Sequence, residues 1–162
     1  SAIPASATKQ SGADSAIFAI LVDSLRGKSD SVDLESEFAA FPDSAAAVPA
    51  LSGWVHKQLP ALDSALVVAL ASERYGGSVR ATLHNGRGVR WSADHSKIAT
   101  PKFSRKYRQL SFTRIAYDSN WTHAVVYASM WCGALCGDES FYAFELRNGV
   151  WRKVGQVVRI SS

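Results

Sequence analysis

Hydrophobic and polar residues alternate with a period of two through much of 110–160. Such alternation is typical of antiparallel strands that bury one face and expose the other. A first run at 110–118 ends in the turn residues Asp118-Ser119-Asn120, and a second run covers 121–131. Two more runs flank Asn148-Gly149. The pattern therefore predicts a four-stranded antiparallel meander with one buried face.

Asn148-Gly149 predicts a type I′ turn, because asparagine and glycine both tolerate the positive φ that its central positions require. A two-residue turn of this kind fixes the register of the strands that it joins. The expected pairs are Arg147 with Val150, Leu146 with Trp151, Glu145 with Arg152 and Phe144 with Lys153. On the buried face we expect Tyr142, Phe144, Leu146 and Trp151, and on the other an exposed ion pair between Glu145 and Arg152.

The first half of the chain is typical of helices joined by short connections. Residues 1–13 show no periodicity and are predicted to be a loose lead. Asp14 is the expected cap of a helix over 15–26, which carries an apolar stripe and stops at Gly27. This stripe is the face that we expect to pack on the sheet.

Two further helices are expected before residue 75. Ser52 would cap a short one that ends near Leu59, and Asp63 would cap a better one over 64–74. Upstream of both, Val32 and Leu34 alternate with polar neighbours and predict a short edge strand.

From residue 79 the period changes towards two, so Val79, Ala81 and Leu83 predict a strand. A second strand is expected over 89–91, and the intervening Asn85-Gly86-Arg87-Gly88 fits either a hairpin turn or a longer loop. We therefore predict one α+β domain over 14–162, with a helical part at 14–75 and a β part at 78–160. Its N-terminal helices would pack on a C-terminal antiparallel meander of about four strands.

The net charge of +4 conceals a strong asymmetry along the chain. Residues 1–79 carry a net charge of −4, residues 80–114 carry +8, and residues 115–162 are neutral. The basic stretch suggests an anion-binding surface. Its candidate residues are Arg87, Arg90, Arg105, Lys106 and Arg108. The favoured alternative is that these charges are neutralised within the molecule or simply solvate a loop.

Aromatic residues lie among and beside these cations. If the small residues of 121–131 face the core, Trp91, Trp121, Tyr127 and Trp131 are partly exposed. Exposed rings next to cations build surfaces for glycans and single-stranded nucleic acids. The favoured alternative is that residues 78–108 cover the second face of the sheet and these rings belong to the core.

Residues 112–161 resemble the C-terminal region of a group of uncharacterised bacterial exported proteins. Four motifs carry the resemblance: Ala124-x-Val126-Tyr127, Cys132-Gly133-Ala134-Leu135-Cys136-Gly137, Asn148-Gly149-Val150-Trp151 and Ile160-Ser161. In this chain the cysteine loop continues into Asp138-Glu139-Ser140, which is more acidic than the usual small residue and glycine. The resemblance implies export from a bacterial cell, and it brings no activity, substrate or cofactor.

Cys132 and Cys136 are the only two cysteines of the chain. In an exported protein such a pair is normally a disulfide, which here would fix the shape of a short loop. A redox thiol is the alternative, but the spacing differs from the C-x-x-C of thioredoxin-like sites. A zinc site is disfavoured because the sequence has no second Cys/His pair at ligand spacing.

No sequence motif of a known catalytic or cofactor site is present, and His56, His84, His95 and His123 are scattered. His123 is interpreted as an ordinary strand residue, and we expect no cofactor and no metal. No apolar run is long enough to form a transmembrane segment.

These observations favour a non-enzymatic, exported binding or accessory protein of the bacterial envelope. We expect it in the periplasm, either free or anchored through its N-terminus, since the chain opens on small polar residues without methionine. An acidic protein, a glycan or a lipid headgroup would be its partner, and export argues against nucleic acid. The alternatives are a small hydrolase with a cleft between helices and sheet, and a polyanion-binding module that uses residues 80–114.

Overall fold

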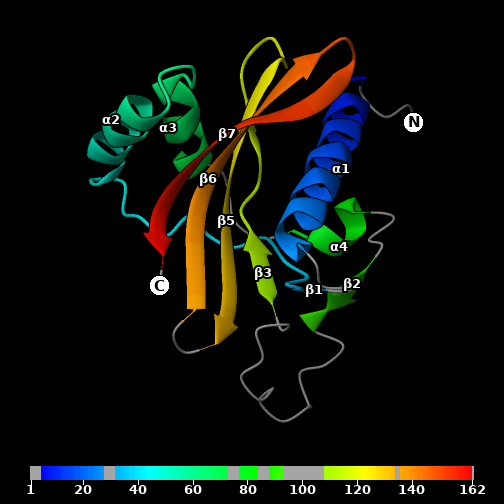
Figure 1. The fold of residues 1–162 in the computed structure, drawn as a ribbon. Coiled ribbons are helices and arrows are strands. Elements are labelled where there is room, and N and C mark those ends of the chain that lie inside the picture. Colours follow the sequence, from blue (N-terminus) through cyan, green and yellow to red (C-terminus); the bar gives the residue numbers. More distant parts are fainter. Residues whose placement is uncertain are drawn as a thin grey trace.

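The computed structural model describes residues 5–27, 32–72, 77–83, 88–92, 108–133 and 136–161. Within these ranges it is a mixed α+β fold, with helices on both sides of a seven-stranded, mostly antiparallel sheet (Figure 1). The helices are α1 (Ala5–Arg26), α2 (Val48–Gln58), α3 (Ser64–Ser72) and α4 (Val79–Thr82). The strands are β1 (Val32–Leu34), β2 (Val89–Trp91), β3 (Gln109–Phe112), β4 (Ala116–Tyr117), β5 (His123–Gly133), β6 (Cys136–Arg147) and β7 (Val150–Ser161).

The sheet has the strand order β2-β1-β3-β5-β6-β7, and β4 pairs with β5 beyond the end of β3. The predicted meander is present as β3 to β7, although its first strand is divided into β3 and β4. The division falls at Thr113, where the Tyr127 amide donates to the side-chain Oγ1. The prediction of a meander of about four strands is only roughly met, because the sheet also includes β1 and β2, and β1 pairs in parallel with both β2 and β3.

The parallel corner corrects the prediction of an edge strand at Val32 and Leu34. β1 lies between β2 and β3, is parallel to both, and all three of its residues are buried. Parallel strands are usually buried on both faces, and short ones carry little sequence signal of their partners. Alternation alone could therefore locate this strand but could not place it inside the sheet.

The Asn148-Gly149 hairpin forms as predicted. Asn148 has φ 51° and Gly149 has φ 76°, the two positive values that a type I′ turn requires. All four predicted pairs are found in the register of β6 and β7. One detail was wrong: the Glu145 carboxylate forms its ion pair with Arg147 on its own strand, at 2.7 Å, instead of with Arg152.

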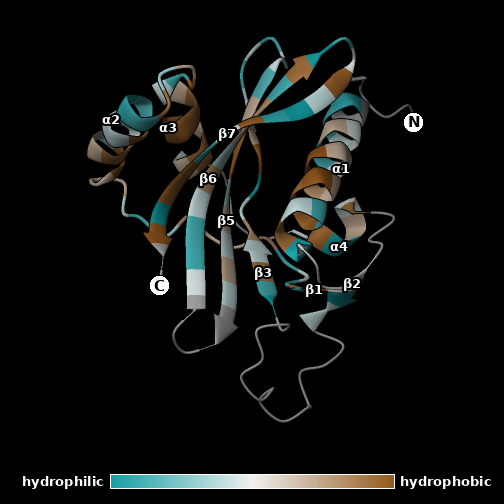
Figure 2. Ribbon diagram, in the orientation of Figure 1, coloured by the Kyte–Doolittle hydropathy of each residue, from teal (hydrophilic) through white to brown (hydrophobic). Residues whose placement is uncertain are grey.

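One hydrophobic core lies between α1, α4 and one face of the sheet. Its members include Phe18, Phe112, Phe144, Leu21 and Leu110, and the Phe18 and Phe112 rings stack with their centres 5.3 Å apart. Residues Ala124, Val126 and Ala128 of β5 belong to this core, as their alternation predicted. The hydrophobic residues of α1 are visible in Figure 2.

A second core lies on the opposite face, under α2 and α3. It joins Val55, Val67 and Leu70 of the helices to Val125, Tyr127, Phe141, Ala143 and Val157 of the sheet. The prediction of one buried face was therefore wrong. Tyr127 is buried, as the favoured alternative expected, but α2 and α3 provide the cover in place of residues 78–108, and Trp131 is exposed. The long β5–β6–β7 ladder needs cover on both faces, because its alternate residues are apolar on both sides.

The segment between β1 and α2 crosses the second face of the sheet. Phe41 lies against the rings of Tyr127 and Phe141, and Asp43 forms a two-point ion pair with Arg159 on β7. Further along, Gly155 of β7 leaves room for Leu59, whose Cδ2 would lie 2.7 Å from a Cβ at that position. These contacts hold α2 and α3 over the second face of the β5–β6–β7 ladder.

Helix ends differ from the prediction in two places. α1 begins at Ala5, so most of the expected loose lead is helical, and Asp14 accepts a hydrogen bond from the Tyr117 hydroxyl instead of capping. α2 begins at Val48, and Ser52 lies inside it with its hydroxyl donating to the Pro49 carbonyl. Serine and aspartate readily cap helices, but tertiary contacts decide whether they do.

The other helix predictions have mixed outcomes. Asp63 accepts from the Ala65 amide, as a helix cap should, and Gly27 ends α1 with φ 60°. The strand predicted over 79–83 is wrong, because α4 forms there and Ser78 Oγ accepts from the Ala81 amide. The buried Val79 and Leu83 are four residues apart, a spacing that suits one helix face as well as one strand face.

Candidate binding face of the sheet

A row of polar and aromatic side chains crosses four strands on the second face of the sheet. Arg90 pairs with Asp33, Asp33 with Gln109, and Gln109 with Trp131 in the strand registers. Residues directly opposite each other on paired strands share a face. Tyr127 lies on the same face of β5 and is part of the second core, so the row continues from that core towards the other end of the sheet.

A second row lies between the first and the core. Ser111 is opposite Ser129, and Ser129 is opposite Glu139. We call the two rows together the Trp131 face. It consists of Asp33, Arg90, Gln109, Ser111, Ser129, Trp131 and Glu139. The same sheet surface therefore changes from apolar under α2 and α3 to polar beyond them.

Trp131 is the aromatic centre of this face, and 43% of its surface is exposed. The exposed part of the indole ring offers a flat apolar surface to a ligand. On either side the strands bring hydroxyl, amide and carboxylate groups to the same surface. The combination of a flat ring with neutral hydrogen-bonding groups is suited to a ligand that has both an apolar face and many hydroxyls.

A hydrogen bond and an ion pair hold Gln109 and Arg90 of the Trp131 face in place. The Gln109 amide donates to the Glu35 carboxylate, and the Arg90 Nε atom lies 2.8 Å from the Asp33 Oδ1 atom. Asp33 is almost fully buried while half of the Arg90 side chain is exposed. The Asp33 carboxylate thus orients a guanidinium group that still reaches solvent.

The orientation of the Glu139 side chain is set by a hydrogen bond from Tyr127, a residue of the second core. The Tyr127 hydroxyl donates to Glu139 Oε2 at 2.5 Å, and burial raises the pKa of Tyr127, with the nearby carboxylate of Glu139 adding to the effect. The Arg159 guanidinium also contacts this hydroxyl, and its own pKa is raised chiefly by the hydrogen bond to Asp43. A tyrosine that stays protonated keeps donating, so Glu139 stays oriented towards the face.

The charges of this region argue against a polyanion as the ligand. The described residues of the Trp131 face, taken together with Glu35, carry three carboxylates (Asp33, Glu35 and Glu139) and one cation, Arg90. Arg159 contacts the Tyr127 hydroxyl beside Glu139, but it is paired with Asp43. A polyanion would have to approach these carboxylates, and like charges repel. A neutral, hydroxyl-rich ligand can instead donate hydrogen bonds to them.

The predicted anion-binding set is only partly within the described chain. Arg90 pairs with Asp33, and Arg108 donates from Nη1 to the carbonyl oxygen of Leu25 at 2.6 Å, near the end of α1. Arg87, Arg105 and Lys106 lie outside the described residues, as do the side chains of Cys132 and Cys136. The two arginines that can be placed both have partners within the molecule.

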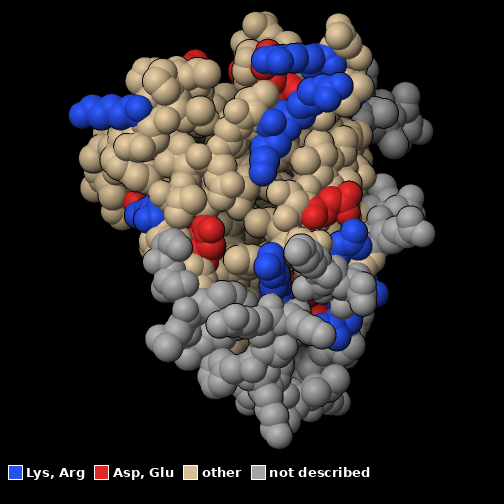
Figure 3. All heavy atoms as spheres, in the orientation of Figure 1, with Lys and Arg blue, Asp and Glu red and all other residues tan. Residues whose placement is uncertain are grey.

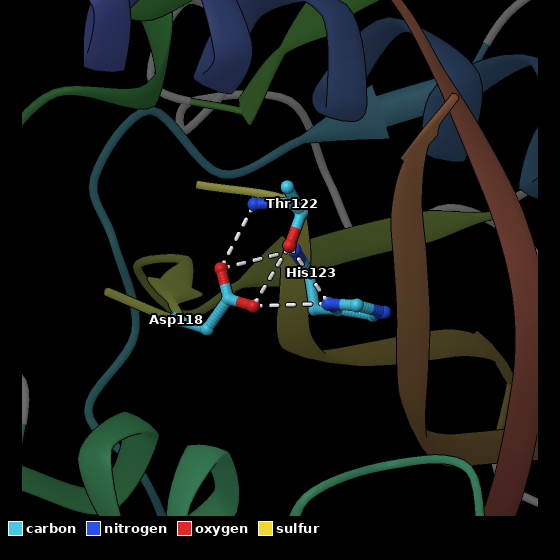
Figure 4. Close-up of polar contacts among 3 residues, drawn as sticks. All are labelled: Asp118, Thr122 and His123. Atoms are coloured by element: carbon cyan, nitrogen blue, oxygen red, sulfur yellow. Dashed lines mark hydrogen bonds and ion pairs between the residues drawn. The ribbon is translucent and has the colours of Figure 1, made fainter. Parts of the chain in front are cut away.

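A second polar cluster lies at the turn before β5 (Figure 4). Asp118 Oδ2 lies 2.9 Å from His123 Nδ1 and 3.0 Å from Thr122 Oγ1, while Asp118 Oδ1 accepts from both backbone amides. Burial alone would raise the pKa of Asp118, but these hydrogen bonds together hold it below its ordinary value. The sequence interpretation treated His123 as an ordinary strand residue and missed this pairing, for which an aspartate five residues earlier in the turn was the available signal.

Trp131 was among the rings that the sequence offered as exposed, and Glu139 was noted for its acidic loop. Gln109, Ser111 and Ser129 were missed, because only the strand register brings them beside Trp131.

No group of three metal-ligating side chains is found in the part of the chain that the structure describes. Within the same ranges, no helix is both long and apolar enough to cross a membrane. No family model, curated protein or solved structure matches the chain.

Proposed function

We propose that this protein is a non-enzymatic, exported binding or accessory protein of the bacterial envelope, and that it holds a neutral glycan on the Trp131 face. The observation that carries the proposal is the exposed Trp131 ring within two rows of fixed polar groups. The export part rests on the sequence resemblance. The C–H groups on one side of a sugar ring would stack on the indole, and its hydroxyls would bond to Gln109, Ser129 and Glu139.

The test uses titration calorimetry after a screen of neutral oligosaccharides on a glycan array. Trp131→Ala should weaken the binding of any sugar found by at least about tenfold, as expected for a central aromatic contact. Trp54→Ala is the matched control, because Trp54 lies on α2 and is 36% exposed. Equal affinity of wild type and Trp131→Ala would refute the site, and no binding to any neutral glycan would refute the ligand class.

A small hydrolase is the second candidate, and the Asp118–His123 pair is the observation that favours it. Both close contacts of His123 use Nδ1, which leaves Nε2 as the nitrogen that could take a proton from an attacking water. Hydrolysis of p-nitrophenyl esters should then disappear in His123→Gln. The same slow hydrolysis in both proteins would exclude this candidate for esters.

Polyanion binding through residues 80–114 is the third candidate. Arg105→Glu with Lys106→Glu should then lower the salt concentration at which the protein leaves heparin. The substitution of Arg108 is avoided because its guanidinium bonds to Leu25. Unchanged elution would exclude the basic stretch as a working surface.

A further inference from the structure

β7 is the outermost strand on one side of the sheet. In the described sheet it pairs with β6 alone, and it extends over twelve residues from Val150 to Ser161. An edge strand has backbone amides and carbonyls that point away from its neighbour and can pair with another strand. The described structure thus offers a long docking edge on this side.

The part of β7 next to the turn combines exposed apolar and cationic side chains. Val150 is 52% exposed and Val154 is 43% exposed. Between them lie Arg152 and Lys153, both exposed, and Arg147 precedes the turn. Figure 3 shows Lys and Arg side chains gathered over this end of the β6–β7 hairpin.

This cationic end is concealed in the sequence, because residues 115–162 are neutral in sum. The fold separates their charges. Arg159 is neutralised by Asp43, and Glu139 is held by Tyr127 in the other half of the sheet. Among the described residues, Glu145 is the carboxylate that forms an ion pair with the three cations of the hairpin end, through Arg147.

Lys153 Nζ donates to Ser24 Oγ on α1 at 3.3 Å and lies 5.6 Å from the centre of the Tyr142 ring. Asp118 also lies at this end, bonded to His123, which is opposite Glu145.

The same features disfavour a second copy of this chain as the partner. Two β7 strands side by side would bring the cations of one copy to the cationic edge of the other, and like charges on paired strands are destabilising. The two register irregularities with β6, at Ala143/Phe144 and Glu139/Ser140, also distort the edge. The first irregularity falls at Val154, at the end of the proposed edge, and it affects any added strand alike. The cationic side chains are therefore what disfavours a second copy while attracting an acidic strand.

We propose that the Val150–Val154 edge of β7 docks an extended acidic segment of a partner protein by strand addition. The backbone of the segment would pair with β7. Arg152 is opposite Glu145 and Lys153 is opposite Phe144, so the two cations lie on opposite faces of the sheet. Adjacent acidic residues in an extended segment also point to opposite faces, so a Glu-Glu pair flanked by β-branched residues would place one carboxylate beside Arg152 and the other beside Lys153. Lys153 would exchange its exposed contact with Ser24 Oγ for that carboxylate.

The probe is a synthetic peptide, Thr-Val-Thr-Glu-Glu-Val-Thr-Val, with Gln-Gln and Lys-Lys versions in place of Glu-Glu. Fluorescence anisotropy of the labelled peptide should show binding of the Glu-Glu version, at least about tenfold weaker binding of the Gln-Gln version, and none of the Lys-Lys version. Arg152→Glu should weaken the Glu-Glu peptide by a similar factor. Lys57→Glu is the matched control, since it makes the same charge change at an exposed position of α2 and should leave binding intact.

Amide hydrogen exchange separates strand addition from simple charge attraction. Bound peptide should slow the exchange of those β7 amides between residues 150 and 154 that do not bond to β6. Equal binding of the three peptides, or charge-dependent binding without slower exchange on β7, would overturn the proposal. A dimer in analytical ultracentrifugation that the peptide fails to dissociate would also overturn it. So would anionic lipid vesicles that bind more tightly than the peptide, if Arg152→Glu abolishes vesicle binding and leaves peptide binding unchanged.

Discussion

The two ends of the sheet are built in different ways. The antiparallel strands β5, β6 and β7 have eleven or twelve residues each and contribute to both hydrophobic cores. The parallel strands β1, β2 and β3 have three or four residues and contribute buried side chains, such as Leu34 and Phe112, to the first core alone. Their other face carries polar contacts such as the Arg90–Asp33 pair. The long ladder is thus buried on both faces, whereas the short parallel corner is apolar on one face and polar on the other.

The largest loss of stability is expected when core volume is removed from the long antiparallel strands. Phe144 is fully buried in the first core. Phe144→Ala should lower the free energy of unfolding by about 3–5 kcal/mol, because it leaves a cavity as well as losing burial. Urea unfolding followed by circular dichroism measures the loss. A loss below about 1 kcal/mol would show that the meander does not carry the stability assigned to it.

A smaller effect is expected in the parallel corner. Asp33→Ala leaves Arg90 without its buried partner and should cost about 1–3 kcal/mol. Hydrogen exchange should quicken in β1, β2 and β3 and remain slow at the centre of β6, because the corner opens separately. The same acceleration throughout β6 would show that the two regions open as one unit, and the comparison would fail.

Two glycine substitutions, one in the β6–β7 turn and one in α1, test the local backbone geometry and should have opposite effects on stability. Gly149 has φ 76° and open space around it, so Gly149→Ala should cost about 1–2 kcal/mol from backbone strain alone. Gly12 lies in α1, also in open space, and Gly12→Ala should stabilise the protein by about 0.5–1 kcal/mol. Thermal unfolding of both variants checks the opposite signs. A destabilising Gly12→Ala would contradict the assignment of the early part of α1.

The smallest predicted effect is a pH dependence at the turn before β5. The pKa of Asp118 is lowered in the folded state, so its contribution to stability is present above about pH 4, the range in which the unfolded carboxyl is ionised. That contribution is lost as the pH falls through the folded-state pKa. Asp118→Asn should therefore be less stable than wild type near neutral pH, and the difference should shrink in acid. If the difference in stability between the two proteins did not change with pH, the charge of the Asp118 carboxylate would not contribute to the stability of the fold.

The difference between the two ends also explains what the sequence could predict. Asn148-Gly149 determines a register through two adjacent residues, so pairs such as Leu146 with Trp151 could be predicted and are found. The pairing of β1 with β2 joins Val32 to Val89, and no local signal specifies a partner so distant. Val79 and Leu83 were misassigned for a related reason, since a four-residue spacing fits a helix and a strand equally.

The candidate site was partly predictable on the same grounds. Alternation along 121–131 is enough to place Trp131 on the face opposite Ala128 and Met130. Pairings between strands that are distant in sequence place Gln109 opposite Trp131 and Asp33 opposite Gln109, and alternation within one strand cannot predict them. Hydrophobic periodicity also does not show that α2 and α3 cover the adjoining part of this face, because that depends on tertiary packing.

β7 is the strand through which both cores are completed, and it follows the other described elements in sequence. Its Trp151 packs against the first core, its Val157 belongs to the second, and its Arg159 joins Asp43 from 116 positions earlier. While a ribosome is still making the chain, the helices and β5 can emerge, but neither core can close until β7 has followed. The open edge of β6 is exposed for that interval, and we therefore expect folding to finish only after synthesis has passed Arg159.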